Sequence, residues 1–109
     1  MNEIVLDVET KKSFDEVPGG RSNVAALGIS VAGAYFYEGD RYYAYEEHEL
    51  PELERALQNA DRIIGFNINN FDVPVMQPYM RSLNLATVPV LDIFDDVVAK
   101  LGHRLSLNS

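Results

Sequence analysis

The sequence predicts an α/β domain in which helices pack on a mixed five-stranded sheet. Three observations support this fold class: a continuous apolar run at residues 4–6, an aromatic hairpin pattern at 34–46, and helical spacing of leucines from residue 50 onward. Strands that follow one another directly can pair antiparallel, whereas strands separated by helices run parallel. The expected order is three strands, then helix, strand, helix, strand and helix.

The first half of the chain is expected to supply the antiparallel strands. Residues 3–8 form the first strand, and its unbroken apolar run predicts burial on both faces. Pro-Gly-Gly and mixed charges predict a loop over 11–23. A second strand is expected at about 25–32, and the segment 34–46 reads as a hairpin that turns at 38–40.

The second half alternates helices with short strands. Leucines at helical spacing behind a proline predict a helix over 50–60, and residues 62–66 return to strand. A second helical stripe covers 73–83 and includes Met76 and Met80 as core residues, and Pro78 is expected to kink this helix. A final short strand is expected at 88–93.

The bulk composition limits the class of protein. A chain of 109 residues with 47% hydrophobic and 24% charged residues fits one globular domain, 1–109. No apolar run approaches the roughly 20 residues that cross a bilayer, and the absence of a secretion signal and of cysteine favours the cytoplasm. A net charge of −8 argues against nonspecific coating of nucleic acid. It is compatible with an enzyme that meets phosphates through divalent metal ions.

Acidic residues occur in two stretches that the fold should bring together. Asp7 and Glu9 are two apart in a strand and therefore project from the same face. If the strand at 62–66 lies beside the first strand, Asp72 comes near both of them. Three crowded carboxylates repel one another unless a cation lies between them, and oxygen ligands suit Mg²⁺ or Mn²⁺. The alternatives are an exposed strand end for the pair and a helix N-cap for Asp72.

These two stretches resemble a known family. "LDVET" followed by "IIGFNINNFDVPVM" is similar to the first two motifs of the DEDD-type 3′–5′ exonucleases, which have the ribonuclease H-like fold. The Asn-x-x-x-Phe-Asp spacing of residues 67–72 is especially similar to the proofreading domain of family B DNA polymerases. A junction resolvase on the same fold is an alternative that this second motif argues against.

The resemblance implies roles for individual residues. Asp7 would bridge two Mg²⁺ or Mn²⁺ ions, Glu9 would support one ion and Asp72 the other. The implied reaction is hydrolysis of a terminal phosphodiester by a metal-bound water, on single-stranded or 3′-terminal nucleic acid. Residues in positions that help to hold or frame the terminal nucleotide are Thr10, Asn67 and Phe71. The turn-forming alternative for Asn67 and the core alternative for Phe71 stay open.

One departure from the family pattern concerns a fourth carboxylate. The family's third motif supplies an acid and a Tyr or His that orients the attacking water, but the spacing from His103 falls on Ser109. A third helix is expected over 94–101, and we expect the third motif to lie beyond residue 109 in a longer protein. The chain is therefore predicted to be weakly active or inactive, and apolar surface exposed by truncation favours a homodimer. The alternative is a non-catalytic ribonuclease H-like scaffold or protein-binding module.

Other notable residues have simpler interpretations. His48 is expected on the solvated surface, and the aromatic residues from Tyr35 to Tyr45 in sheet packing rather than base stacking. Asp92 is expected to end the last strand, and Asp95 and Asp96 to open the next helix, where the macrodipole favours acids. The basic residues near the acids, which could reach phosphates, are Lys11, Lys12 and Arg21.

Overall fold

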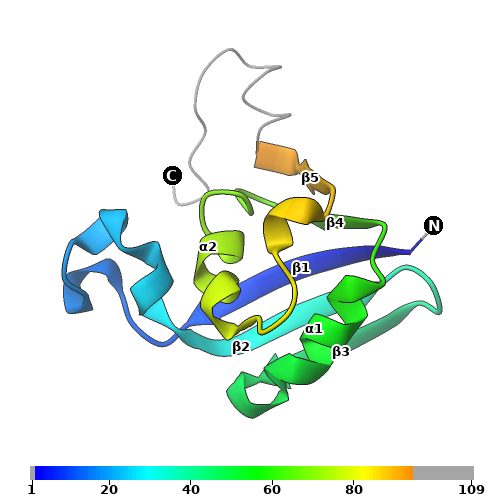
Figure 1. Ribbon diagram of the computed structural model, residues 1–109, viewed down its shortest axis with the longest axis horizontal. Coiled ribbons are helices and arrows are strands. Elements are labelled where there is room, and N and C mark those ends of the chain that lie inside the picture. Colours follow the sequence, from blue (N-terminus) through cyan, green and yellow to red (C-terminus); the bar gives the residue numbers. More distant parts are fainter. Residues whose placement is uncertain (1, 95–109) are drawn as a thin grey trace.

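The computed structural model describes residues 2–94 and confirms the predicted α/β fold with a mixed five-stranded sheet (Figure 1). The strands are β1 (Glu3–Thr10), β2 (Ile29–Phe36), β3 (Arg41–Glu46), β4 (Arg62–Gly65) and β5 (Val90–Asp92). They lie in the order β3-β2-β1-β4-β5. The β1–β2 and β2–β3 pairs are antiparallel, and the β1–β4 and β4–β5 pairs are parallel, as predicted.

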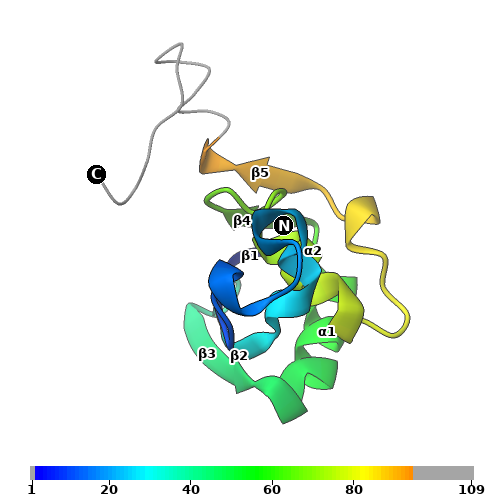
Figure 2. The same ribbon diagram turned by 90° about the vertical axis from the view of Figure 1, so that its left-hand side faces the viewer.

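Two α-helices pack on the sheet, α1 (Leu50–Gln58) and α2 (Asp72–Met76). Both lie on the same side of it (Figures 1 and 2). Short 3₁₀ helices complete the described fold: Phe14–Glu16, Gly20–Ser22, Val24–Leu27, Glu47–Glu49, Gln77–Tyr79 and Leu85–Thr87. The core lies between the helices and the inner face of the sheet, where Leu53 and Leu57 of α1 are fully buried.

Strand β1 is buried on one face only, which corrects the prediction of burial on both. Ile4, Leu6 and Val8 are buried in the core, whereas Asp7 and Glu9 on the opposite face are exposed. The physical reason is the placement of α1 and α2 on the same side of the sheet. Side chains alternate between the two faces of a strand, so covering one face leaves every second residue of β1 outside the core.

The second strand begins later than predicted. Residues 24–27 form a 3₁₀ helix, and β2 starts only at Ile29. Gly28 lies between them with a φ of 71°, a left-handed conformation that glycine adopts without steric strain and that interrupts an extended chain. The small residues that follow belong to the strand because they are buried under the helices: Ala32 and Ala34 are fully buried. The turn at 38–40 is confirmed.

The second helix is shorter than predicted. An α-helix covers only Asp72–Met76, and Gln77–Tyr79 continue as a 3₁₀ helix. Pro78 has no N–H to donate, which explains why the regular helix ends before it. Met76 and Met80 are both buried, as expected. The helix expected over 94–101 lies almost entirely outside the described residues.

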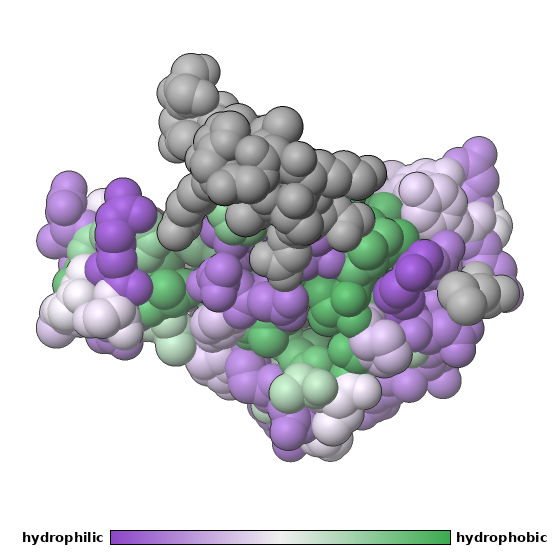
Figure 3. All heavy atoms as spheres, turned by 90° about the horizontal axis from the view of Figure 1, so that it is seen from above, coloured by the Kyte–Doolittle hydropathy of each residue, from purple (hydrophilic) through white to green (hydrophobic). Residues whose placement is uncertain are grey.

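The described surface mixes polar and apolar side chains, as the view from above shows (Figure 3). His48 is exposed, as expected. Aromatic rings of the β2–β3 hairpin contact one another edge to face, for example Phe36 and Tyr43 with centroids 5.8 Å apart, which favours the sheet-packing interpretation. Within residues 2–94, no helix has the length and apolar character needed to cross a membrane.

Candidate functional site

The predicted site residues gather at the carboxyl ends of the parallel strands. Asp7 and Glu9 lie in the second half of β1, the segment 66–71 follows β4, and Asp92 ends β5. In α/β sheets, ligands bind outside the carboxyl ends of the parallel strands. Pairing between β1 and β4 stops at Val5 and Ile64, so the edge of β1 beyond Val5 is left for other partners.

The side chain of Asp72 binds the backbone of β1 at that edge. Its Oδ2 accepts a hydrogen bond of 3.0 Å from the backbone N–H of Val8, the residue between Asp7 and Glu9. The pairing of β1 with β4 therefore brings Asp72 to the first motif, as the crossover rule predicted. Asp72 is the first residue of α2 and Phe71 is its N-cap, which corrects the N-cap interpretation of Asp72.

The carboxyl group of Asp72 lies in an environment that disfavours its charge. Only 5% of the residue is exposed, and burial raises the pKa of Asp72 to about 7. The nearby negative charges of Asp7 and Asp92 raise this pKa further, whereas the hydrogen bond from Val8 lowers it. Because these acids lie close together, a cation bound among them would lower the pKa of Asp72 instead.

The end of β1 is shaped by an irregularity in its pairing with β2. The register shifts between Glu9 and Thr10, and the hydroxyl of Ser30 donates a hydrogen bond of 3.1 Å to the carbonyl oxygen of Glu9. The Thr10 hydroxyl donates to the carbonyl of Lys12, at 3.0 Å. Asp7 and Glu9 share one face of the strand, as predicted. Such bulges re-aim side chains at the ends of strands.

Asn67 is held in a left-handed conformation, with a φ of 55°. Its N–H donates to Asp92 Oδ1 at 2.8 Å, and the N–H of Asn69 donates to Asp92 Oδ2 at 3.2 Å. The side chain of Asn70 donates to Asn67 Oδ1 at 3.1 Å. The turn interpretation of Asn67 therefore has direct support, because asparagine tolerates this backbone conformation better than most residues.

Asp92 has contacts in this region that the sequence analysis did not predict. It was expected to end the last strand, which the structure confirms, and its Oδ1 also accepts the N–H of Phe94 at 3.0 Å. Its other two backbone partners come from the segment after β4, more than twenty residues away. An acid at the end of a short predicted strand was the signal in the sequence, but its tertiary partners cannot be read from local sequence.

Phe71 is half-buried and contacts an aromatic residue from another segment. Its ring meets that of Phe14 edge to face, with centroids 6.3 Å apart. The guanidinium of Arg21 lies 4.9 Å from the centroid of the Phe14 ring. Phe14 and Arg21 belong to the segment that projects between β1 and β2, at the left of Figure 1. Sequence reasoning placed this segment in a loop and gave no role to Phe14.

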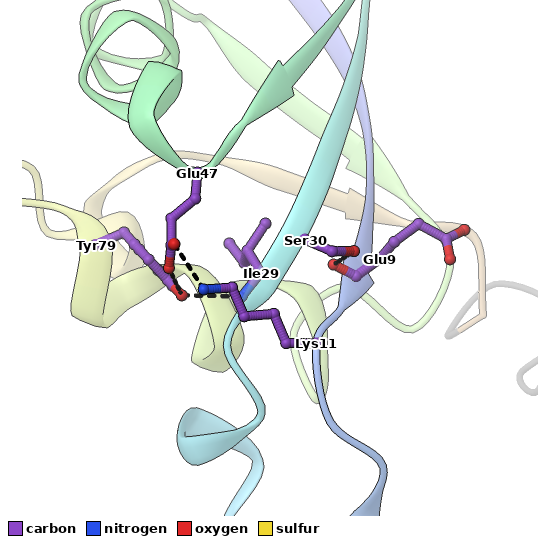
Figure 4. A network of polar contacts seen from close by, with 6 residues as sticks. All are labelled: Glu9, Lys11, Ile29, Ser30, Glu47 and Tyr79. Carbon is purple, nitrogen blue, oxygen red and sulfur yellow. Dashed lines mark hydrogen bonds and ion pairs between the residues drawn. The ribbon is translucent and has the colours of Figure 1, made fainter.

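Lys11 forms its ion pair with Glu47 and not with Asp7, Glu9 or Asp72. Its Nζ forms an ion pair of 2.6 Å with Glu47, and the hydroxyl of Tyr79 donates to the same carboxylate at 2.9 Å. The Tyr79 oxygen accepts the N–H of Ile29, whereas the carboxylate of Glu9 points away from this network (Figure 4). These contacts lower the pKa of Glu47 and raise that of Lys11. Lys11 is therefore a poor candidate for a phosphate ligand.

The donor chemistry of Asp7, Glu9 and Asp72 fits a hard divalent cation, since all their side-chain donors are oxygens. The buried carboxyl of Asp72, with its raised pKa, is a group that a cation would stabilise. Their ligand atoms do not all lie within 4.8 Å of one another. Within residues 2–94, the group of three that meets this spacing is Glu46, His48 and Glu49, between β3 and α1.

No protein-family model and no curated protein matches this chain. Its structure is similar to that of the family B DNA polymerase from the hyperthermophilic archaeon Pyrobaculum calidifontis, with a TM-score of 0.61 and 15% sequence identity. The similarity covers 88% of this chain but only 16% of the polymerase chain. At this identity the likeness supports the fold class alone, an α/β domain with a mixed five-stranded sheet.

Proposed function

We propose that the chain carries most of a two-metal 3′–5′ exonuclease site that acts on the ends of nucleic acid. The observation that supports the proposal most strongly is the position of Asp72. A buried carboxyl with a pKa of about 7 binds the backbone of Val8, between Asp7 and Glu9, at the carboxyl ends of the parallel strands. A purely structural role does not require an acid in this environment, since asparagine could accept the same hydrogen bond.

In this proposal Asp7, Glu9 and Asp72 hold the Mg²⁺ or Mn²⁺ ions. When bound, the ions would supply an activated water and neutralise the leaving oxygen of the phosphodiester. The chain's own residues would place the substrate: Phe71 and Phe14 offer an aromatic edge, and Arg21 adds a positive charge beside it. Asn67 would shape the turn that begins the second motif. The cytoplasmic location and the homodimer stay predictions from the sequence.

The first test is a Mn²⁺ titration by calorimetry. The His48→Ala variant should serve as the background, because Glu46, His48 and Glu49 form a second group that could bind the ion. In this background, Asp7→Ala is expected to weaken Mn²⁺ binding at least tenfold, because it removes the ligand proposed to bridge both ions. Glu38→Gln is the matched control: it removes an exposed acid from the turn between β2 and β3, and should leave the affinity unchanged.

Equal Mn²⁺ affinity in Asp7→Ala and in the background protein would contradict the proposal. Failure of the background protein to bind Mn²⁺ would favour the alternative function, a non-catalytic scaffold or protein-binding module. The net charge of −8 suits a basic protein partner in that case.

The second test measures nuclease activity on single-stranded DNA and RNA carrying a 5′ label. We expect little or no shortening from the 3′ end, because the chain offers three of the four carboxylates that the reaction needs and no residue assigned to orient the water. Efficient digestion by this chain that is lost in Asp7→Ala would show that the fourth carboxylate is dispensable. It would overturn the prediction of weak activity and support the proposed site.

A further inference from the structure

Asp92 accepts two backbone hydrogen bonds from a distant segment and a third from a near neighbour in the chain. The residue is 5% exposed, and its two oxygens accept three backbone N–H groups. Asn67 N and Phe94 N donate to Oδ1 at 2.8 and 3.0 Å, and Asn69 N donates to Oδ2 at 3.2 Å. Hydrogen bonds to a charged acceptor are stronger than those between neutral groups. This carboxylate therefore holds the backbone of Asn67 and Asn69 firmly in place.

The anchored segment leads directly to the candidate metal ligand. The Asn67 carbonyl accepts the N–H of Phe71 at 3.1 Å, and the Ile68 carbonyl accepts the N–H of Val73 at 2.9 Å. These two bonds set where α2 begins, and Asp72 is its first residue. Contacts therefore run without a break from Asp92 through Asn67 to the carboxylate that binds Val8.

Two other roles for Asp92 fit the geometry less well. As the missing fourth metal ligand it would need lone pairs directed at a cation, yet both oxygens already accept backbone hydrogen bonds. As a simple helix-start residue it would need only the bond to Phe94. The bonds to Asn67 and Asn69 come from a different part of the chain, and Asn67 adopts a left-handed conformation that needs support.

We propose that Asp92 is a positioning residue, which fixes the turn at Asn67–Asn69 and thereby places Asp72 beside Asp7 and Glu9. The inference rests on the proposed metal-binding function of those three acids. Asp92 itself would contact neither metal nor substrate. Its contribution would be to hold Asp72 in place against the repulsion of Asp7.

The test compares two substitutions that remove the same charge. Asp92→Asn keeps one carbonyl oxygen, which can still accept the N–H groups of Asn67 and Phe94, whereas Asp92→Ala keeps no acceptor. Because both lose one negative charge near the site, any difference between them reports positioning rather than electrostatic attraction. Mn²⁺ affinity is measured by calorimetry in the His48→Ala background, well below each variant's unfolding temperature. Hydrogen exchange of the Asn67 and Asn69 amides is followed by NMR.

Glu54 provides a matched control. It is also a buried acid that accepts backbone N–H groups from a distant segment, those of Ser82 and Leu83 at 2.8 and 2.9 Å. That segment follows the 3₁₀ helix Gln77–Tyr79 and carries none of the candidate ligands. Glu54→Gln should therefore leave Mn²⁺ affinity within twofold of the background protein.

We expect Asp92→Ala to bind Mn²⁺ at least tenfold more weakly than the background protein and at least threefold more weakly than Asp92→Asn, with faster exchange of the Asn67 and Asn69 amides. Equal affinities for Asp92→Asn and Asp92→Ala would overturn the inference while leaving the proposed function standing, provided that binding still depends on Asp7. An equal loss in Glu54→Gln would also overturn it. If Asp92→Ala does not fold, Asp92→Asn carries the test: a lowered Mn²⁺ affinity with unchanged exchange of the Asn67 and Asn69 amides would overturn the inference, because the effect would then be electrostatic. If the background protein binds no Mn²⁺, the proposed function and this inference fall together.

Discussion

Asp72→Asn is expected to increase the free energy of unfolding at pH 8 by roughly 2 to 4 kcal/mol while abolishing metal binding. The shift of the Asp72 pKa from 3.8 to about 7 corresponds to roughly 4 kcal/mol against the ionised carboxylate in the folded chain. Asparagine removes the charge and keeps an oxygen that can accept the N–H of Val8. Few substitutions of a polar residue are expected to stabilise a protein. A gain in stability would therefore indicate that the folded chain disfavours the ionised carboxylate of Asp72.

The pH dependence follows from the direction of the shift. Between pH 4 and 7 the unfolded chain has already released the Asp72 proton, whereas the folded chain still holds it. The stability that Asp72 contributes is therefore complete below pH 4, declines as the pH rises, and is lost above about pH 7. The advantage of Asp72→Asn should be largest at pH 8 and should shrink steadily toward pH 5.

Urea unfolding at pH 5, 6 and 8 measures this difference, with Asp15→Asn as a control for the loss of an exposed acid. A gain in stability that does not change with pH would contradict a raised pKa. Saturating Mn²⁺ gives a second comparison, because an ion that binds only the folded state stabilises it. In the His48→Ala background, Mn²⁺ should stabilise the protein that keeps Asp72 and have no effect on the one that also carries Asp72→Asn.

Ile68→Ala is expected to lower the free energy of unfolding by about 2 to 5 kcal/mol, the usual range for a large-to-small change in a core. Ile68 lies inside the second motif but is fully buried, whereas Asn69 and Asn70 beside it are exposed. It packs closely on Gly65, where an added Cβ would come within 3.0 Å of its Cδ1. The side chain therefore fastens the segment after β4 to the core.

Urea unfolding again provides the measurement, and Ile68→Val is the matched control. The smaller change should lower the free energy of unfolding by only about 0.5 to 1.5 kcal/mol. If Ile68→Ala and Ile68→Val have the same small effect, Ile68 does not anchor this segment. As a separate measurement, the Mn²⁺ affinity of the folded Ile68→Ala variant would show whether a cavity beneath the turn also displaces Asp72.

The elements that the sequence predicted well are those fixed by local pattern. The leucine spacing of α1, the turn at 38–40 and the parallel neighbours β1 and β4 were all expected and are observed. Errors arose where tertiary packing overrides local pattern. The left-handed backbone of Gly28 separates the 3₁₀ helix Val24–Leu27 from β2. The small residues of β2 belong to the strand because helices cover them. Pro78 was recognised, but it ends the regular helix rather than kinking it.

In the candidate site too, the features set by local pattern were predicted and those set by tertiary packing were not. The shared face of Asp7 and Glu9 follows from the period of a strand, and the approach of Asp72 follows from the crossover rule. The burial of Asp72, and hence its raised pKa, depends on how α2 meets β1 and has no local signature. The same is true of Asp92, whose partners lie far away in the sequence. Contacts of this kind require the folded arrangement.

The segment between β1 and β2 is closed at its base. Lys11 N donates to the Gly28 carbonyl at 3.2 Å and Lys12 N to that of Leu27 at 3.1 Å, so its two ends are held side by side. Because the entropy of closing a loop grows only slowly with length, doubling it would cost about 0.6 kcal/mol. The exposed tip at Pro18 and Gly19 is consequently a site where a peptide tag or reporter domain could be inserted without disturbing the sheet.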